Sequence, residues 1–308
     1  MSVLTRLGGG AGEGGARLRR IAVLAPPFLW LAVFFGLPIL VVFGISLAEP
    51  VTGIPPYTAI VDWTSGRLPR FIGDFEKYAT LFTDPYYLDG LFGAVRIAVT
   101  STAICLVIGY PMAWAIARAR PGVRLALLLL VMVPFWTSFL IRIYAWMTIL
   151  NSNGLANQLL LASGLIDRPA VLLYTDFAVY VGIVYAYLPF MVLPVYAVLD
   201  RIDRNLLEAA ADLGARPVRA FVSITLPLSL SGVVAGCVLV FVPALGEYVV
   251  PELLGGSDFV MIGRLLWTES FQNRDWPMAA AIAIALLLVV VVPVMLIQRL
   301  VEPEGERA

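Results

Sequence analysis

The sequence predicts an all-α integral membrane protein. Hydrophobic residues make up 60% of the chain and the mean hydropathy is +0.90. Charged residues make up only 14%, against about 25% in soluble proteins. Runs of about 20 apolar residues are long enough to cross a bilayer as helices. Six such runs are predicted to be spans, at residues 21–47, 91–117, 124–150, 175–199, 228–251 and 277–300.

Basic residues predict how these spans are oriented. If the spans alternate, thirteen arginines fall on one side of the membrane and six basic residues on the other. The thirteen lie before the first span, in the turn after the second, in the loop 200–227 and at the end of the chain. The positive-inside rule therefore places both termini and the loop 200–227 in the cytoplasm. Residues 1–20 are expected to be a flexible basic tail near lipid headgroups, and residues 302–308 a second cytoplasmic tail.

The opposite side is acidic. Twelve acidic residues map outside or to the outer membrane edge, so this face would attract cations, although the positive-inside rule alone would also leave acids there. The first external loop, 48–90, contains several prolines and aromatic residues. We expect it to be folded and partly helical, and to offer a place for another protein to bind.

A polar segment, Asp203–Pro227, interrupts the apolar sequence. Asp203 is a typical helix cap, and Leu206, Leu207, Ala210 and Leu213 follow at helical spacing, so they should share one face. Gly214 is expected to end this helix in the left-handed conformation, and Pro217 to open a second one. A polar helix pair at the membrane surface predicts a docking partner in the aqueous phase, although an ordinary amphipathic surface helix is the alternative.

The spacing within this segment is specific. Glu208-Ala209-Ala210 is followed after three residues by Gly214, and after nine more by Ile224, then by Leu226-Pro227. This pattern resembles the coupling-loop signature of the membrane subunits of ATP-binding-cassette (ABC) importers. The resemblance implies that Glu208, Ala209, Ala210, Gly214, Arg216 and Pro227 contact the ATPase subunit and transmit its closure.

The sequence contains no P-loop for ATP. Its single lysine, Lys77, lies outside any G-x-x-x-x-G-K-[ST] motif, so ATP cannot bind through a P-loop of this chain. Histidine is absent, and Cys105 and Cys237 lie in predicted spans, where they are expected to be packing residues. We therefore expect no catalysis, metal or cofactor here, with ATP and magnesium bound by a separate ATPase.

Charged residues within the spans are candidates for the substrate path, because burying an unpaired charge in hydrocarbon is costly. Arg142 lies in the third span, and Glu247 and Glu252 lie in or beside the fifth. Pro243, Gly246 and Pro251 should break the helix near these acids, and irregular backbone at membrane depth is tolerated where it lines a cavity. An Arg142–Glu247 pair that only ties two spans together is the alternative.

Aromatic residues gather at the same depth and include Trp136, Tyr185 and Tyr248. Aromatic rings and carboxylates suit an alkylammonium ligand, because rings attract cations and carboxylates pair with the charged ends. The interfacial aromatic belt of membrane proteins is the competing explanation. We assign Trp136, Tyr185 and Tyr248 to the substrate path and Tyr144, Trp146, Tyr174 and Tyr180 to the belt.

A closer resemblance covers residues 70 to 300. It rests on the runs VPFWTSFLIRIYAW, VYVGIVYAYLPFMVLPVY, LLEAAADLGARP, ELLGGSDFVMIGRLLW and NRDWPMAAAIAI. These runs are similar to the first permease subunit of bacterial putrescine/spermidine importers, the polyamine branch of the ABC family. The resemblance implies a type I importer fold, with a membrane domain over residues 21–301 and a coupling loop at 200–227.

The resemblance also implies an assembly. A second, related permease subunit would pair with this chain, two copies of a cytoplasmic ATPase would dock on the coupling helices, and a periplasmic polyamine-binding protein would deliver substrate. Membrane lipid is an expected partner and nucleic acid is not.

Three other functions are considered. Within the importer class, the substrate could instead be an opine, an amino-acid derivative or an anion such as phosphonate; Arg142 would suit an anion, whereas Glu247 and Glu252 suit a cation. An ion-coupled secondary transporter would not need the loop from Glu208 to Pro227. A membrane scaffold or sensor would explain neither that loop nor the broken acidic span.

Overall fold

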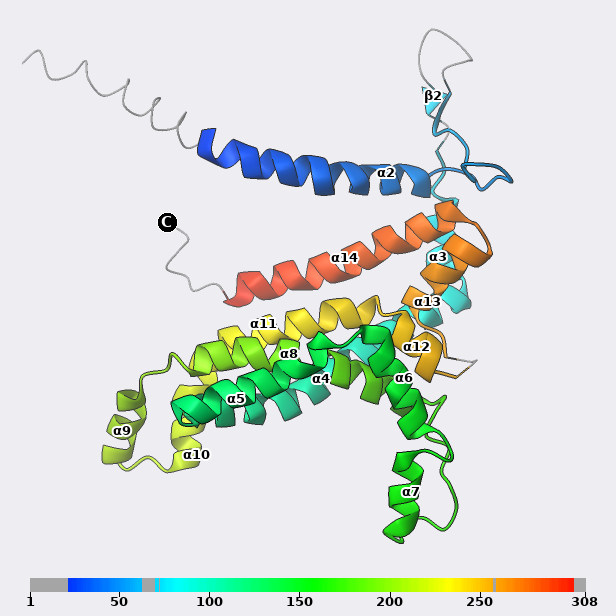
Figure 1. Cartoon of the computed structure of the whole chain (residues 1–308). Coiled ribbons are helices and arrows are strands. Elements are labelled where there is room, and N and C mark those ends of the chain that lie inside the picture. The colour runs from blue at the N-terminus through cyan, green and yellow to red at the C-terminus, as the bar shows by residue number, and fades with distance from the viewer. Residues whose placement is uncertain (1–21, 63–69, 72, 257–258, 302–308) are drawn as a thin grey trace, which may run out of the picture. The chain divides into compact units, whose positions relative to one another are not determined.

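The computed structural model describes residues 22–62, 70–71, 73–256 and 259–301 (Figure 1). The tails predicted for residues 1–20 and 302–308 lie outside the described residues. The described residues divide into two compact units. Those of Met1–Tyr78 and Asp275–Ile284 form one unit, and those of Ala79–Arg274 and Ala285–Ala308 form the other.

The first unit begins with a helix, Ala22–Ser46, which contains a π-helical turn η1 (Ala32–Gly36) and continues as α2 (Leu37–Ser46). The loop predicted to be external, residues 48–90, is partly helical as predicted, because it contains α3 (Glu76–Thr83). It also contains two short antiparallel strands, β1 (Val61–Asp62) and β2 (Arg70–Phe71). The all-α prediction did not include these strands, since two-residue strands carry no hydrophobic alternation for sequence reasoning to detect.

The second unit is built from helices. Their bounds are α4 (Pro85–Arg118), α5 (Pro121–Met132), η2 (Val133–Trp136), α6 (Phe139–Leu150), α7 (Leu155–Ala162), α8 (Asp176–Leu199), α9 (Arg204–Asp212), α10 (Pro217–Ala220), η3 (Phe221–Thr225), α11 (Leu226–Leu245), α12 (Val249–Leu254), α13 (Ile262–Trp267), η4 (Thr268–Gln272) and α14 (Trp276–Val301), the last of which both units share. Helices α4, α8 and α11 pack against one another. In Figure 1, α9 and α10 extend from one end of this bundle, and α12 and α13 lie at the other.

Five helices among the described residues are long and apolar enough to cross a membrane. They are Ala22–Ser46, Pro85–Arg118, Asp176–Leu199, Pro217–Leu245 and Trp276–Met295. The run predicted as one span at 124–150 is instead bent by 92° between Pro121–Trp136 and Phe139–Ala162. Thr137, at the bend, has an extended backbone (φ −101°, ψ 153°), and it follows the short helix that contains Pro134. The described spans therefore number five, or six if the bent pair counts as one.

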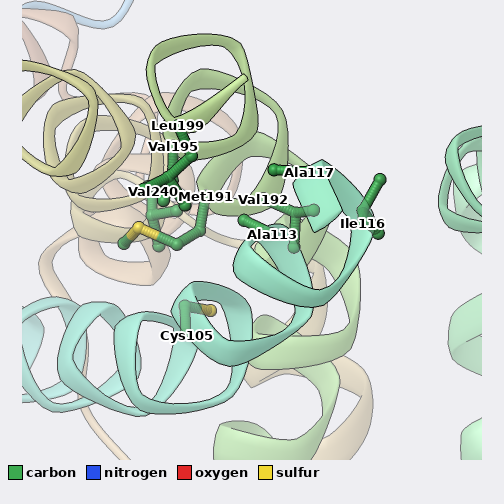
Figure 2. Close-up of a cluster of buried hydrophobic side chains, with 9 residues drawn as sticks. All are labelled: Cys105, Ala113, Ile116, Ala117, Met191, Val192, Val195, Leu199 and Val240. Atoms are coloured by element: carbon green, nitrogen blue, oxygen red, sulfur yellow. The ribbon is translucent and has the colours of Figure 1, made fainter. Parts of the chain in front are cut away.

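The core of the second unit lies where α4, α8 and α11 meet. Figure 2 shows the buried cluster, whose members are Cys105, Ala113, Ile116, Ala117, Met191, Val192, Val195, Leu199 and Val240. Both cysteines are free, and Cys105 packs in this cluster as predicted. Gly232 of α11 permits close approach, because a Cβ there would lie 2.8 Å from the carbonyl oxygen of Pro194. Small residues at helix contacts are typical of packing in membranes.

Candidate functional site

The predicted coupling loop forms a capped helix at one end of the α4–α8–α11 bundle. The carboxylate of Asp203 accepts a hydrogen bond from the backbone N–H of Asn205 at 3.0 Å, so Asp203 caps α9 as predicted. Gly214 has a φ of +79°. Its N–H donates to the carbonyl oxygen of Ala211 at 2.8 Å, and that of Ala215 donates to Ala210 at 2.9 Å. These two bonds form a Schellman motif, which confirms the predicted end of the helix.

The second helix of the loop also begins where predicted. Pro217 occupies the first turn of α10, after Arg216 at the N-cap. This helix does not end within the loop, because it continues through η3 into α11 as one apolar helix, Pro217–Leu245. The span predicted at 228–251 therefore starts earlier and ends earlier, since Pro217 opens the helix and Gly246 follows its last residue.

The side chains of this loop are largely exposed. Leu213 is 89% exposed, and Glu208 and Ala209 are also exposed, as are Arg216 and Pro227. The predicted single apolar face is divided, because Leu207 and Ala210 are half-buried whereas Leu206 and Leu213 face outward. Val218 and Val222 extend the exposed apolar surface. An exposed apolar patch beside an exposed charge is typical of a protein interaction site.

The predicted helix break near the acids is present at the other end of the bundle. α11 ends at Leu245, Gly246 follows, and α12 starts at Val249. Glu247 lies in the break and is 8% exposed. Its Oε1 accepts hydrogen bonds from the N–H groups of Val249 at 3.0 Å and Val250 at 3.3 Å. The hydroxyl of Tyr187 donates to its Oε2. Both oxygens of this buried carboxylate are thus engaged within the chain.

Glu252, the second acid of this region, has its own partner. Its carboxylate forms an ion pair with Arg264, at 2.8 Å from Nε to Oε2, and the Glu252 side chain is 37% exposed. Arg264 also donates from Nη1 to the carbonyl oxygen of Phe259 at 3.1 Å. Glu252 is therefore partly accessible, and Arg264 joins α12 to the turn before α13.

An aromatic row lies beside Glu252. Tyr248 stacks on Trp267 with ring centroids 4.6 Å apart, and Trp267 lies 4.1 Å from Phe271. Phe271 is 63% exposed. Tyr248 was predicted for the substrate path, but Trp267 and Phe271 were not. The helical i, i+4 spacing of Trp267 and Phe271 was the available sequence signal.

Arg142 lies beside the bend in the third apolar segment. Its guanidinium carbon is 5.1 Å from the ring centroid of Phe135 and 5.5 Å from that of Phe139. Its Nε and Nη1 are buried, and no described residue accepts a hydrogen bond from them. Arg142 and Glu247 do not form an ion pair in this conformation, contrary to the alternative that such a pair joins the two spans. The ion pairs among the described residues are Arg96–Asp176, Arg124–Asp200 and Arg264–Glu252.

The other predicted path residues have aromatic or open surroundings. Trp136 is 74% exposed at the bend. Tyr185 packs edge-to-face on Trp146, with centroids 5.4 Å apart. Across the described part of the chain, no group of three or more His, Cys, Asp or Glu side chains has the arrangement of a metal site.

Comparison with known proteins finds one family along nearly the whole chain. Residues 18–304 match the family model described as binding-protein-dependent transport system inner membrane component. The chain is 39% identical over 260 residues to the spermidine/putrescine transport system permease protein PotB of Salmonella typhimurium strain SL1344, covering 84% of this chain and 86% of PotB. It is 38% identical to PotB of Escherichia coli K12, covering 84% and 90%.

A solved structure has the same fold. A chain of a bacterial ABC transporter involved in the import of the acidic polysaccharide alginate matches with a TM-score of 0.61 at 20% identity. The match covers 94% of this chain and 98% of that one. At this identity the likeness concerns the fold alone.

Proposed function

Because the chain belongs to the family of binding-protein-dependent transport system inner membrane components, we propose that it is a permease subunit of an ATP-driven importer of polyamines. It is a multi-pass inner-membrane protein. Its similarity to the two PotB proteins, named for spermidine and putrescine, supports the polyamine substrate. Opines, amino-acid derivatives and phosphonates are the alternative substrates.

We propose six spans with both termini in the cytoplasm. The bent pair Pro121–Trp136 and Phe139–Ala162 supplies the third span, beside the five helices long enough to cross alone. The distribution of arginines supports this orientation, because most of them then face the cytoplasm. The same orientation puts α9 where a cytoplasmic protein can reach it.

The exposed surface of α9 is the main support for coupling to an ATPase. Glu208, Ala209 and Leu213 are exposed at a helix that is fixed at both ends by Asp203 and Gly214. A rigid helix with an exposed apolar and charged face can transmit a movement of the protein bound to it. We propose that it docks on one of two ATPase subunits, that a second permease completes the pore, and that a periplasmic binding protein delivers the substrate.

The substrate path is proposed at the helix break. Glu252 and the row Tyr248, Trp267 and Phe271 offer a carboxylate and ring faces, which suit an alkylammonium group. Glu247 has a positioning role in this proposal, because it caps α12 and so fixes the end of the break that carries Glu252. Arg142, Trp136 and Tyr185 are proposed to line the path nearer the bend.

In this proposal the chain performs no chemistry. Closure of the ATPases would move α9, and the rigid bundle of α4, α8 and α11 would carry that movement to the break. The pore would then alternate between inward- and outward-facing states that differ in their contacts with the substrate and the ATPases.

The experiment is the ATPase activity of the complete assembly in lipid nanodiscs with its binding protein. Putrescine, spermidine, an opine and a phosphonate are compared. Stimulation by the polyamines alone is expected. Stimulation by the phosphonate alone would keep the importer and exclude the polyamine assignment, and Arg142 would then be the residue to mutate.

A further inference from the structure

A polar cavity lies beside α9, at the end of the bundle where α4 and α8 terminate. Its volume is about 590 Å³. It is bounded by the last residues of α4 and α8, the first turn of α5, the start of α9 and Thr225 of η3. Leu207 and Asp203 place α9 directly on its wall.

Three residues that line this cavity carry buried hydrogen-bond donors that have no acceptor. They are Nε1 of Trp114, Nε of Arg124 and Oγ1 of Thr225, and no described residue accepts a bond from any of them. Thr225 is only 3% exposed. Leaving a buried donor unpaired costs about 1–3 kcal/mol, so an acceptor that these side chains could reach by a small shift would stabilise this end of the bundle.

The charges around the cavity also favour an anion. Both carboxylates that line the cavity have partners within the chain: Asp200 forms an ion pair with Arg124, and Asp203 accepts a hydrogen bond from the first turn of α9. Arg118 and Arg201 also line the cavity, and neither forms an ion pair with a described carboxylate. The guanidinium of Arg118 lies 4.0 Å over the ring of Trp114, which holds it at the cavity wall.

We propose that this cavity binds a phosphate group. A phosphate offers the acceptor oxygens that the three donors lack, and arginine is well suited to bind it through paired N–H groups. The group can come from the headgroup of an anionic phospholipid or from a free phosphate ion. The ends of α4 and α8 lie where long apolar helices meet the polar loop, and basic pockets between helices at that depth are suited to lipid headgroups.

The site has a consequence for α9. A phosphate held by Arg118, Arg201 and Thr225 would bridge α4, the loop after α8 and η3, and these segments surround the start of α9. Occupancy would therefore stiffen the base of the proposed docking helix. The binding itself does not depend on the transported substrate, so it can be tested even if the polyamine assignment fails.

The test is native mass spectrometry of the detergent-purified full chain titrated with phosphatidylglycerol. The variants are Arg118→Gln, Arg201→Gln and Thr225→Val, and Arg219→Gln is the matched control, an exposed arginine of the same loop outside the cavity. We expect each arginine variant to weaken the tightest binding event about tenfold, Thr225→Val to weaken it severalfold, and Arg219→Gln to leave it unchanged. Inorganic phosphate, followed by its shift of the melting temperature, is the second probe.

The two probes distinguish the sources. Variant-dependent binding of phosphatidylglycerol alone identifies a lipid site, and variant-dependent stabilisation by inorganic phosphate identifies a site for the free ion. Equal binding of both probes by the wild type and all three cavity variants would overturn the proposal. A rise in the melting temperature of Thr225→Val without ligand, and no loss of binding, would do so as well, because the buried hydroxyl would then be merely unpaired.

Discussion

The loop around α9 and the break before α12 carry similar residues and use them in opposite ways. Glu208 is exposed and forms no described bond or ion pair, whereas Glu247 is 8% exposed and both of its oxygens are engaged. Leu213 projects outward, whereas Val250 and Leu254 of α12 are fully buried. The side chains of the loop are therefore accessible to another molecule, whereas those of the break are engaged within the chain. The same type of side chain is accessible in one region and held by hydrogen bonds in the other.

The largest expected effect is on stability, at the break. Glu247→Ala removes the cap of α12 and the acceptor of Tyr187, and should lower the free energy of unfolding by about 3 kcal/mol. Glu247→Gln keeps an acceptor oxygen and should cost about 1 kcal/mol. Chemical unfolding of the detergent-purified chain measures both. Glu252→Gln, at a partly exposed ion pair, is the control and should cost less than about 1 kcal/mol. Equal costs for all three variants would remove the distinction between buried and accessible acids.

The next effect is on transport, at the loop. Glu208→Lys reverses an exposed charge, so uptake by the assembled importer should fall at least about tenfold while the melting temperature stays unchanged. Asp167→Lys, another charge reversal at an exposed residue, should leave uptake unchanged. Retained uptake in Glu208→Lys would exclude Glu208 from the ATPase contact.

A smaller effect is expected at the end of α9. Gly214→Ala places a side chain at a φ of +79° and should cost about 1 kcal/mol. No neighbouring atom lies within 4 Å of the added Cβ, so the cost is conformational rather than steric. Gly122→Ala, in α5 and equally free of neighbours, is the control and should be neutral or stabilising. In thermal unfolding, the melting temperature should fall for Gly214→Ala and stay the same or rise for Gly122→Ala.

The smallest effect on stability is expected at Leu213. Because this side chain is 89% exposed, Leu213→Ser should change the free energy of unfolding by less than about 0.5 kcal/mol. Association of the Leu213→Ser variant with the ATPase, measured by co-purification from membranes, should weaken severalfold. Leu165→Ser, at a leucine that is 73% exposed, should change neither quantity. A large loss of stability in Leu213→Ser would show that the side chain packs within the chain.

Local rules predicted the loop well. The cap at Asp203, the left-handed Gly214 and the helix start at Pro217 depend on neighbouring residues, so the sequence around each was sufficient. Hydropathy likewise predicted the five helices that are long and apolar enough to cross a membrane alone, because that property depends on length and composition only.

Tertiary contacts were not predictable in the same way. Proline and glycine predicted the break after Leu245, but not that Glu247 would cap α12, since Glu is not a preferred capping residue. The bend between Trp136 and Phe139 was missed, because hydropathy continues across it and reports no direction. The partners of Arg142 and Glu247 depend on how the helices pack. The residues next to them in the sequence do not determine that packing.

Docking of α9 on an ATPase can be detected by site-directed cross-linking. Leu213→Cys would be expressed with the other subunits of its assembly and treated with a short bifunctional maleimide. The wild type measures any background from Cys105 and Cys237, and Leu165→Cys is the matched exposed control. We expect a cross-link between residue 213 and the ATPase that the control does not give. A functional assembly with no cross-link at 213, or with an equal one at 165, would contradict it.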